Sequence, residues 1–276
     1  MQNGLYNPRT LGPREGQVLA WLETERPSVI EVGDVAAAVG ISREHARTVA
    51  SRLERKGWLA RLSRGRYQPL LGDTGGWAAP DPWAALDGWA RPHYVSFASA
   101  AHELGLTSDR PGDVQVATVQ GVGLPPRMAS AGVRLVRMRR FTLTGSAKRR
   151  LHGHEVWIAG AERCILDSAT HLALAGGALG LARMIARAHE SLDWQQLVAM
   201  SAQLPRGAPA LRRLGALLDL LELQIPGVLQ RAVVAKTRRP IPLDDGVPVQ
   251  RATVVVDRWN VAVNVSPEAI REEIHR

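Results

Sequence analysis

Residues 41 to 67 limit the possible fold more than any other part of the sequence, because a helix-like pattern is followed at once by two strand-like ones. Ser42 stands where a helix N-cap belongs, and Gly57 follows the expected end of the helix. Between them, hydrophobic residues recur at the spacing of one helical face. That face comprises Ile41, Ala46, Val49, Ala50 and Leu53. The segment therefore predicts a helix that buries one face and exposes the other.

The flanking residues complete a small domain. Residues 13 to 25 begin with Pro13, which is favourable at a first helical position, and repeat hydrophobic residues at helical spacing. A short second helix is expected from about Asp34, closed by Gly40, because glycine readily adopts the left-handed conformation after a helix end. The runs GWLARL and RGRYQPL are strand-like and meet at residues 63 to 65, which predicts a hairpin. Three helices and a hairpin make a winged helix-turn-helix.

Positive charge is concentrated in the same segment. Residues 41 to 67 hold eight Lys and Arg but two Glu, which is +6 of the chain's net charge of +9. The isoelectric point is near 10.8. A cytosolic protein this basic usually meets a polyanion, nucleic acid more often than a membrane surface. A charged face that only keeps a helix soluble is the simpler interpretation, but the hairpin that follows and the lack of balancing acids disfavour it.

With the hydrophobic face buried, the remaining residues of the third helix point outward and can enter a major groove. Arg, Ser and Thr can read base edges there, while arginines of the hairpin are placed to neutralise phosphates. The candidate DNA-binding residues are Ser42, Arg43, Glu44, Arg47, Thr48, Ser51, Arg52, Arg55, Arg61, Arg64 and Arg66.

The full chain has 276 residues, 45% of them hydrophobic, which is enough for two domains. Residues 71 to 82, LGDTGGWAAPDP, gather Gly and Pro without hydrophobic periodicity, so we expect the joint there. This predicts a winged-helix domain at 1–72 and a C-terminal domain at 73–276. The single cysteine, Cys164, excludes an internal disulfide and fits a reducing compartment. No signal-peptide pattern or long apolar run is present, so we expect a cytoplasmic protein without a membrane partner.

The C-terminal domain mixes strand and helix patterns. DVQVATV and VRLVRM resemble strands, whereas AERCILDSATHLALA and GALGLARMIARAHESL resemble helices. Residues 252 to 265 predict a strand pair with a turn near residues 258 to 260. The expected fold class is therefore α+β, an N-terminal winged helix-turn-helix followed by a larger mixed α/β domain.

No catalytic or metal-binding constellation is evident in this domain. His152 and His154 stand near Glu155, but zinc sites use three or four well-placed ligands, and a polar exposed loop explains the group better. The sequence GSAKRR at 145–150 lacks the following Asp-x-Asp pair of nucleotidyltransferases. Cys164 lies between hydrophobic neighbours, as a core thiol does. We therefore expect no enzymatic activity, no cofactor and no metal.

A second basic cluster spans residues 134 to 150 and contains seven Lys and Arg and no acid. It is expected on strands and a turn, with one strongly positive sheet face. Such a face could extend the DNA contact or receive an acidic or RNA-bound partner. A solvated strand edge, which uses charge to block aggregation, explains it equally well. The second basic patch comprises Arg134, Arg137, Arg139, Arg140, Lys148, Arg149 and Arg150.

Several motifs resemble those of AbiEi-type antitoxins and occur in the order seen in that family. They are YVSFASAAHELGL, VQVATV, GHEVWIAGAERCILDSA, LRRLGALLDLLEL and DRWNVAVNV. With the N-terminal winged helix, the resemblance covers nearly the whole chain. ERTLLD is the usual form in the family, so Cys164 replaces a threonine here.

The resemblance implies a two-domain protein encoded beside a nucleotidyltransferase-like toxin. Its N-terminal domain would bind inverted repeats in its own promoter and repress it. Its C-terminal domain would be required to neutralise the toxin, often without a stable complex. The expected partners are thus double-stranded DNA and the toxin.

The residues leave two alternatives open. One is a nuclease or nucleic-acid-modifying enzyme delivered by the winged helix. The other is a ligand-sensing transcriptional regulator, which the lack of convergent polar residues in the C-terminal sequence weakens.

Overall fold

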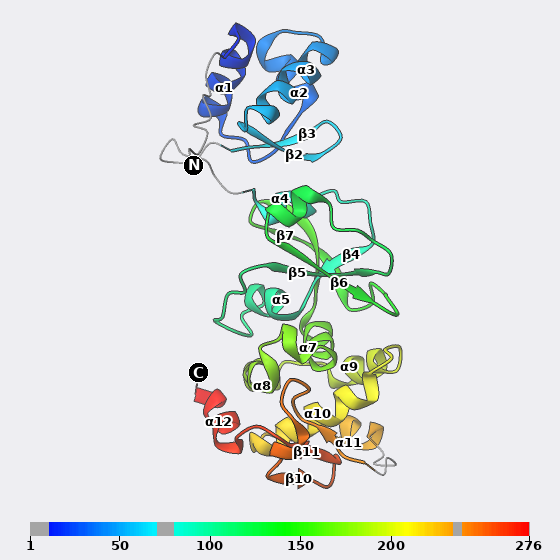
Figure 1. The fold of residues 1–276 in the computed structure, drawn as a ribbon. Coiled ribbons are helices and arrows are strands. Elements are labelled where there is room, and N and C mark those ends of the chain that lie inside the picture. Colours follow the sequence, from blue (N-terminus) through cyan, green and yellow to red (C-terminus); the bar gives the residue numbers. More distant parts are fainter. Residues whose placement is uncertain (1–10, 71–79, 234–238, 276) are drawn as a thin grey trace. The chain divides into compact units, whose positions relative to one another are not determined.

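The computed structural model describes residues 11–70, 80–233 and 239–275 (Figure 1). The chain forms two compact units. Unit 1 comprises residues 1–90, 124–133 and 150–155, and unit 2 comprises residues 91–123, 134–149 and 156–276. Residues 71–79 of the expected joint at 71–82 lie outside the described residues, so the boundary at residue 72 stays a prediction.

Unit 1 begins with the three expected helices. They are α1 (Pro13–Glu25), α2 (Val32–Val39) and α3 (Arg43–Arg55). Helix α2 starts earlier than expected, because the backbone N–H of Glu31 donates to the carboxylate of Asp34 at 2.7 Å and makes Glu31 the N-cap. Gly40 ends the helix at φ 61°, in the left-handed region, as the sequence predicts.

The expected hairpin follows α3. Strand β2 (Leu59–Ser63) pairs antiparallel with β3 (Arg66–Pro69), and β1 (Ile30–Glu31) pairs with the other edge of β3. Ser63 pairs with Arg66, so the connecting turn has only two residues, Arg64 and Gly65. Gly65 has φ 80°, a conformation that favours glycine and tightens the turn.

The core of unit 1 draws one hydrophobic face from each helix and closes it with the hairpin. The fully or nearly fully buried residues are Val18, Leu22, Ile30, Val35, Ala46, Val49, Ala50, Leu53, Leu59 and Tyr67. The predicted inner face of α3 is therefore confirmed, with Ile41 partly buried against it. Two further short helices belong to unit 1, α4 (Pro82–Leu86) and α6 (Pro126–Ser130).

A five-stranded sheet lies mainly in unit 2. Its order is β6-β5-β4-β8-β7. The strands are β4 (His93–Val95), β5 (Val114–Val119), β6 (Val133–Met138), β7 (Ser146–Leu151) and β8 (His154–Ala159). Both expected strands, β5 and β6, are confirmed. The order places β6 and β7 at opposite edges of the sheet.

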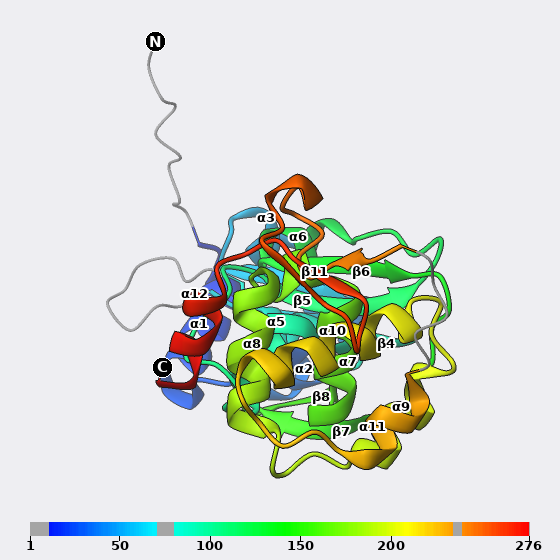
Figure 2. The same ribbon diagram turned by 90° about the horizontal axis from the view of Figure 1, so that it is seen from below.

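The rest of unit 2 is largely helical. The helices are α5 (Phe97–Glu103), α7 (Ala161–Thr170), α8 (Gly177–Ala188), α9 (Trp194–Ser201), α10 (Gly207–Leu220), α11 (Gly227–Ala232) and α12 (Pro267–Glu272). Helix α7 packs against α5, α8, α9 and α10 (Figures 1 and 2). The predicted helices at α7 and α8 are confirmed.

A small second sheet completes unit 2. Strand β10 (Val254–Val256) pairs antiparallel with β11 (Val261–Val263), as the sequence predicts, and β11 pairs in parallel with β9 (Ile241–Pro242). The protein is thus a mixed α/β chain with several sheets. Among the described residues, no helix combines the length and the apolar composition needed to cross a membrane.

Candidate nucleic-acid interface

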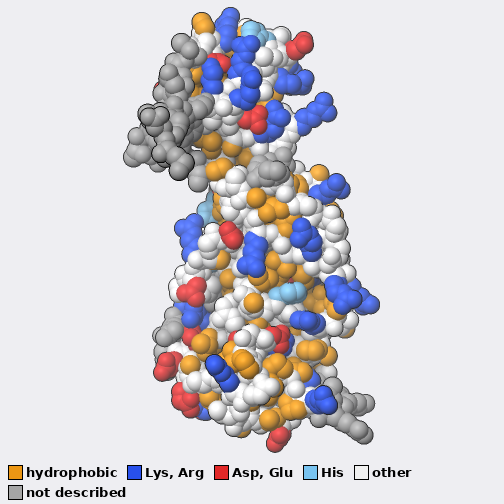
Figure 3. Space-filling view, viewed as in Figure 1, with side chains coloured by type: hydrophobic (Ala, Val, Ile, Leu, Met, Phe, Trp, Pro, Cys, Tyr) orange, Lys and Arg blue, Asp and Glu red, His pale blue; other side chains and the backbone are white. Residues whose placement is uncertain are grey.

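The outer face of α3 carries the first group of predicted site residues. Ser42 caps the helix, because its hydroxyl oxygen accepts from the backbone N–H of His45 at 3.2 Å. Since one face of α3 is buried, the polar side chains lie on the other. Those that are exposed are Arg43, Glu44, Arg47, Thr48, Arg52 and Arg55, while Ser51 is half-buried. Figure 3 shows Lys and Arg side chains gathered over the three-helix part of unit 1.

The two ends of this face differ. At the C-terminal end, Arg52, Arg55 and Lys56 line a hollow together with the buried carboxylate of Glu15 from α1. Burial alone would raise the pKa of Glu15, but hydrogen bonds from Lys56 and from the backbone of Gly12 outweigh it and hold the pKa below its ordinary value. Part of the positive charge there therefore serves to join α3 to α1.

At the N-terminal end, Arg43 and Arg47 lie one helical turn apart. Neither forms an ion pair with a carboxylate in the part of the chain that the structure describes. A Cβ added at Gly33 would lie 3.1 Å from a guanidinium nitrogen of Arg43, so this side chain lies beside the start of α2. Recognition helices read base edges with their N-terminal residues, so Arg43 and Arg47 are the best-placed candidates.

The hairpin arginines have different surroundings. Arg61 donates to the hydroxyl of Tyr67 at 3.0 Å, pairs with Glu54 at 3.1 Å and lies over the Tyr67 ring. The hydrogen bond to Tyr67 is the main reason that the pKa of Arg61 is raised. Arg66 is half-buried and donates to the carbonyl of Asp87 at 2.9 Å.

Arg64 sits at the turn of the hairpin, and its side chain is exposed. It makes no ion pair with any described carboxylate. Of the three hairpin arginines, Arg64 is therefore the one available to a phosphate without breaking an internal contact.

The second basic patch is divided between the two edges of the large sheet. Arg134 and Arg137 belong to β6, whereas Lys148, Arg149 and Arg150 belong to β7, with three strands between them. The patch is thus two groups.

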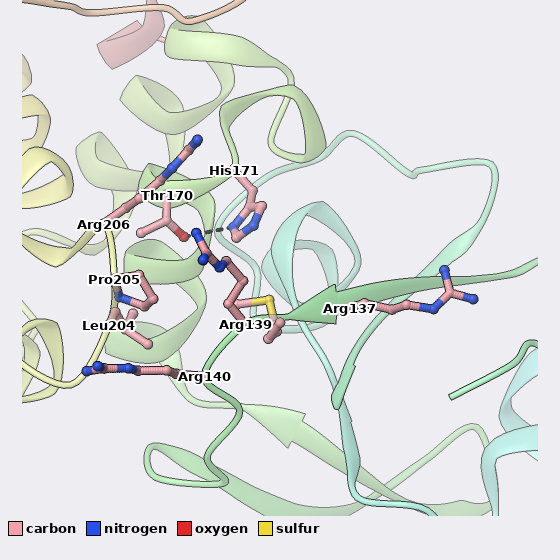
Figure 4. Close-up of a pocket in the computed structure, with 9 residues that line it drawn as sticks. Arg137, Arg139, Arg140, Thr170, His171, Leu204, Pro205 and Arg206 are labelled. Atoms are coloured by element: carbon pink, nitrogen blue, oxygen red, sulfur yellow. Dashed lines mark hydrogen bonds between the residues drawn. The ribbon is translucent and has the colours of Figure 1, made fainter. Parts of the chain in front are cut away.

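The β6 group continues into a cleft of about 460 Å³ within unit 2. Its lining comes from three segments that are distant in sequence: the end of β6, the end of α7 and the loop between α9 and α10. The lining residues are Arg137, Met138, Arg139, Arg140, Thr170, His171, Leu204, Pro205 and Arg206. Figure 4 shows Arg139 directed toward Thr170 and His171, while Arg137 points away along its strand. The convergent polar residues that the sequence did not reveal are therefore present.

Helix α7, whose last residue lines this cleft, contains a buried ion pair that is hydrogen-bonded to β4 and the residue after it. The guanidinium of Arg163 donates to the carboxylate of Asp167 at 2.9 Å, and both side chains are almost fully buried. Tyr94 and Ser96 donate to the other oxygen of Asp167, at 2.9 and 2.8 Å. Burial raises the pKa of the Tyr94 hydroxyl far above its ordinary value, with the Asp167 charge adding to the effect. This network satisfies the Asp167 carboxylate and joins α7 to β4 and Ser96.

Two other expectations concern residues outside the interface. His154 is buried at the start of β8 rather than on an exposed loop, and its ring nitrogens lie 3.3 Å from Asp81 and 3.4 Å from Asp87. Cys164 is a buried core thiol, as expected, and burial raises its pKa.

Comparison with known proteins bears on the N-terminal segment. The family model described as "Transcriptional regulator, AbiEi antitoxin" matches residues 17–69, from within α1 to the end of β3. This segment, called the AbiEi segment below, is similar to that family. The match confirms the family resemblance for that part of the chain and supports a role as antitoxin or transcriptional regulator.

The crystal structure of the Rv2827c protein from Mycobacterium tuberculosis is similar over the whole fold. It shares 20% sequence identity, covers 97% of each chain and superposes with a TM-score of 0.71. At this identity the likeness shows the fold alone. No curated protein matches the sequence.

Beyond the AbiEi segment, sequence reasoning missed three residues that the structure makes prominent. Arg163 carries a local signal, its spacing of four from Asp167, which places both on one face of a helix. His171 and Arg206 carry no such signal, because each is separated in sequence from the basic runs and only the fold brings them to the cleft.

Proposed function

We propose that this chain is a DNA-binding transcriptional autorepressor that also acts as an antitoxin. The observation that carries the DNA-binding part is the exposed N-terminal half of α3, where Arg43 and Arg47 have no carboxylate partner among the described residues. The family match over the same segment supports it. The proposed ligand is double-stranded DNA with inverted repeats in the chain's own promoter, which places the protein in the cytoplasm.

The arrangement of unit 1 supports a winged-helix mode of binding. Helix α3 would lie in the major groove, with Arg47 and Thr48 facing base edges and Arg43 near the start of the helix. The hairpin β2–β3 would act as the wing and bring Arg64 to the phosphate backbone. In this division, α3 supplies sequence discrimination and the wing supplies affinity that does not depend on sequence.

The antitoxin part of the proposal concerns a nucleotidyltransferase-like toxin encoded beside this chain. Its support is the matched family description together with the C-terminal motifs that resemble the same family. We assign neutralisation to the C-terminal part of the chain, without assuming a stable complex. We further propose that the chain binds DNA without cleaving it.

Promoter binding is tested by fluorescence anisotropy of full-length protein on its own upstream DNA and on a shuffled duplex of the same composition, in matched salt. The upstream DNA is expected to bind more tightly, and Arg47→Ala should remove most of that preference. Equal affinity for the two duplexes would contradict the proposal. Incubation of the protein with Mg²⁺ and plasmid tests the nuclease alternative, and cleavage that co-purifies with the protein would support that alternative.

Antitoxin action is tested separately from repression. The neighbouring toxin is expressed from an unrelated inducible promoter, and the antitoxin variant Arg43→Ala/Arg47→Ala/Arg64→Ala is supplied in trans. The three side chains are exposed, so the variant should stay folded, lose promoter binding and still rescue growth. Cell death despite normal levels of the variant would show that the two activities share one surface.

A further inference from the structure

The cleft in unit 2 holds positive charge without a partner. Arg139, Arg140 and Arg206 are exposed at its walls and rim. Within residues 11–70, 80–233 and 239–275, none of the three forms an ion pair with a carboxylate. Guanidinium groups that share a concave surface repel one another more than they would on a convex one, because less water separates them. An anion in the cleft would relieve that repulsion.

The cleft also has the dimensions and walls of a ligand site. Its volume of about 460 Å³ exceeds the space that a single inorganic ion requires and falls within the usual range for small-molecule pockets. Leu204 and Pro205 form an apolar side, and the Arg140 side chain extends toward them (Figure 4). With arginines on one side and apolar residues on the other, the cleft matches a ligand that has one anionic end and an apolar or aromatic body.

At the floor of the cleft, the imidazole ring of His171 is oriented by a hydrogen bond to Thr170. The hydroxyl of Thr170 donates to the carbonyl oxygen of Asp167 at 2.8 Å, because a carbonyl can only accept. The 2.8 Å bond between Thr170 Oγ1 and His171 Nδ1 must then take its proton from the imidazole. Nε2 is left without a hydrogen bond among the described residues, and it becomes a donor when the ring is protonated.

We propose that the cleft binds the terminal phosphate of a nucleotide-sized ligand. Arg139 and Arg206 supply the paired N–H donors that match phosphate oxygens, Arg140 closes the apolar side, and His171 lies at the floor. Two sources present this chemistry, a small soluble phosphate compound and the phosphorylated end of a nucleic-acid strand. The site is separate from α3, and its occupation does not require promoter binding.

The test is isothermal titration of the full-length chain with pyrophosphate at constant ionic strength. The variant Arg139→Gln/Arg206→Gln removes two charges from the cleft. Its matched control, Lys148→Gln/Arg149→Gln, removes two exposed charges from β7, outside the cleft. Pyrophosphate affinity is expected to fall roughly tenfold or more in the cleft variant and to stay within about twofold in the control. Arg139→Gln alone is used if thermal melting shows that the double variant is unfolded.

A second pair of titrations distinguishes the sources. A short single-stranded oligonucleotide is compared with and without a 5′-phosphate. Tighter binding of the phosphorylated strand, lost in the cleft variant, supports a nucleic-acid end, whereas equal binding of the two strands together with pyrophosphate binding supports a small soluble ligand. The proposal is overturned if the wild-type chain binds neither pyrophosphate nor the phosphorylated strand. It is also overturned if the cleft variant and the β7 control lose equal affinity.

Discussion

The protein carries two concentrations of arginine that differ in how they are built. Arg43 and Arg47 lie along one regular helix, α3, with exposed side chains and a complete hydrophobic face beneath them. The arginines of the unit 2 cleft come from the end of β6 and from the loop before α10, and they enclose a concave space. A convex helix can enter a groove in a large polyanion, whereas a concave site suits the end of a ligand.

The two sites also differ in the interactions that hold their helices in place. Helix α3 is held by apolar packing, and at its C-terminal end Lys56 forms an ion pair with Glu15, with the charge of Arg52 nearby. Helix α7, which brings Thr170 to the cleft, contains the buried pair between Arg163 and Asp167, and such a pair requires both partners. The first site should therefore tolerate changes in charge, and the second should not tolerate changes to its buried charges.

The largest expected effect is a loss of folding free energy when the buried ion pair of α7 is broken. Asp167→Asn leaves the Arg163 guanidinium buried without its anion, which should cost about 3–5 kcal/mol of folding free energy. Urea titration followed by circular dichroism measures the loss, with the exposed Glu190→Gln as control. Promoter affinity should change little while the protein is folded. A loss below about 1 kcal/mol would mean that the pair behaves as a surface ion pair.

The next effect concerns α3 alone. Arg47→Ala should reduce affinity for the promoter by about 1–3 kcal/mol and relax sequence preference, because a base-edge contact is lost. Anisotropy titrations on promoter and shuffled DNA measure both. The cleft variant Arg139→Gln/Arg206→Gln serves as the control, because it removes two positive charges outside α3, whereas Arg47→Ala removes one. Equal losses on the two duplexes would remove Arg47 from base readout.

A smaller effect tests the wing. Arg64→Ala should lower the slope of log affinity against log salt by about 0.9, the value for one phosphate contact, and weaken all sequences alike. Arg61→Ala, which removes the same charge from a residue already paired with Glu54, should change the slope less. Salt titrations of both variants measure the two slopes. A larger change in slope for Arg61→Ala than for Arg64→Ala would assign the phosphate contact to Arg61.

The smallest expected effect is a pH dependence of anion affinity in the cleft. Burial lowers the pKa of His171 and nearby Arg206 adds to this, while Asp167 opposes it, so the ring is largely neutral near neutral pH. An anion in the cleft favours the protonated ring, so sulfate affinity should rise a few-fold as pH falls from about 7.5 to about 5.5. Sulfate itself does not titrate there. His171→Asn should abolish the pH dependence, and an unchanged dependence in that variant would exclude His171 as its source.

Much of unit 1 could be predicted because its signals are local. Pro13, Ser42 and Gly40 act on their own helix ends, and hydrophobic spacing alone placed the inner face of α3. The start of α2 was missed by two residues, because Asp34 served as the capping partner of Glu31 and not as the first residue of the helix. The role of Arg61 was not visible either, since its partners Glu54 and Tyr67 meet it only when β2 and β3 pair.

By itself, the sequence determined the three helices and the hairpin of unit 1, several elements of unit 2 and which face of α3 is charged, because hydrophobic period, caps and turn residues act within a few positions. The tertiary structure alone decided which charges are neighbours. It separated Arg137 from Lys148 by three strands, although they stand close in sequence, and it brought Arg139, His171 and Arg206 to one cleft. The physical reason is that charge interactions act through space over a few ångströms, and chain order does not set that distance once a sheet and its helices have packed.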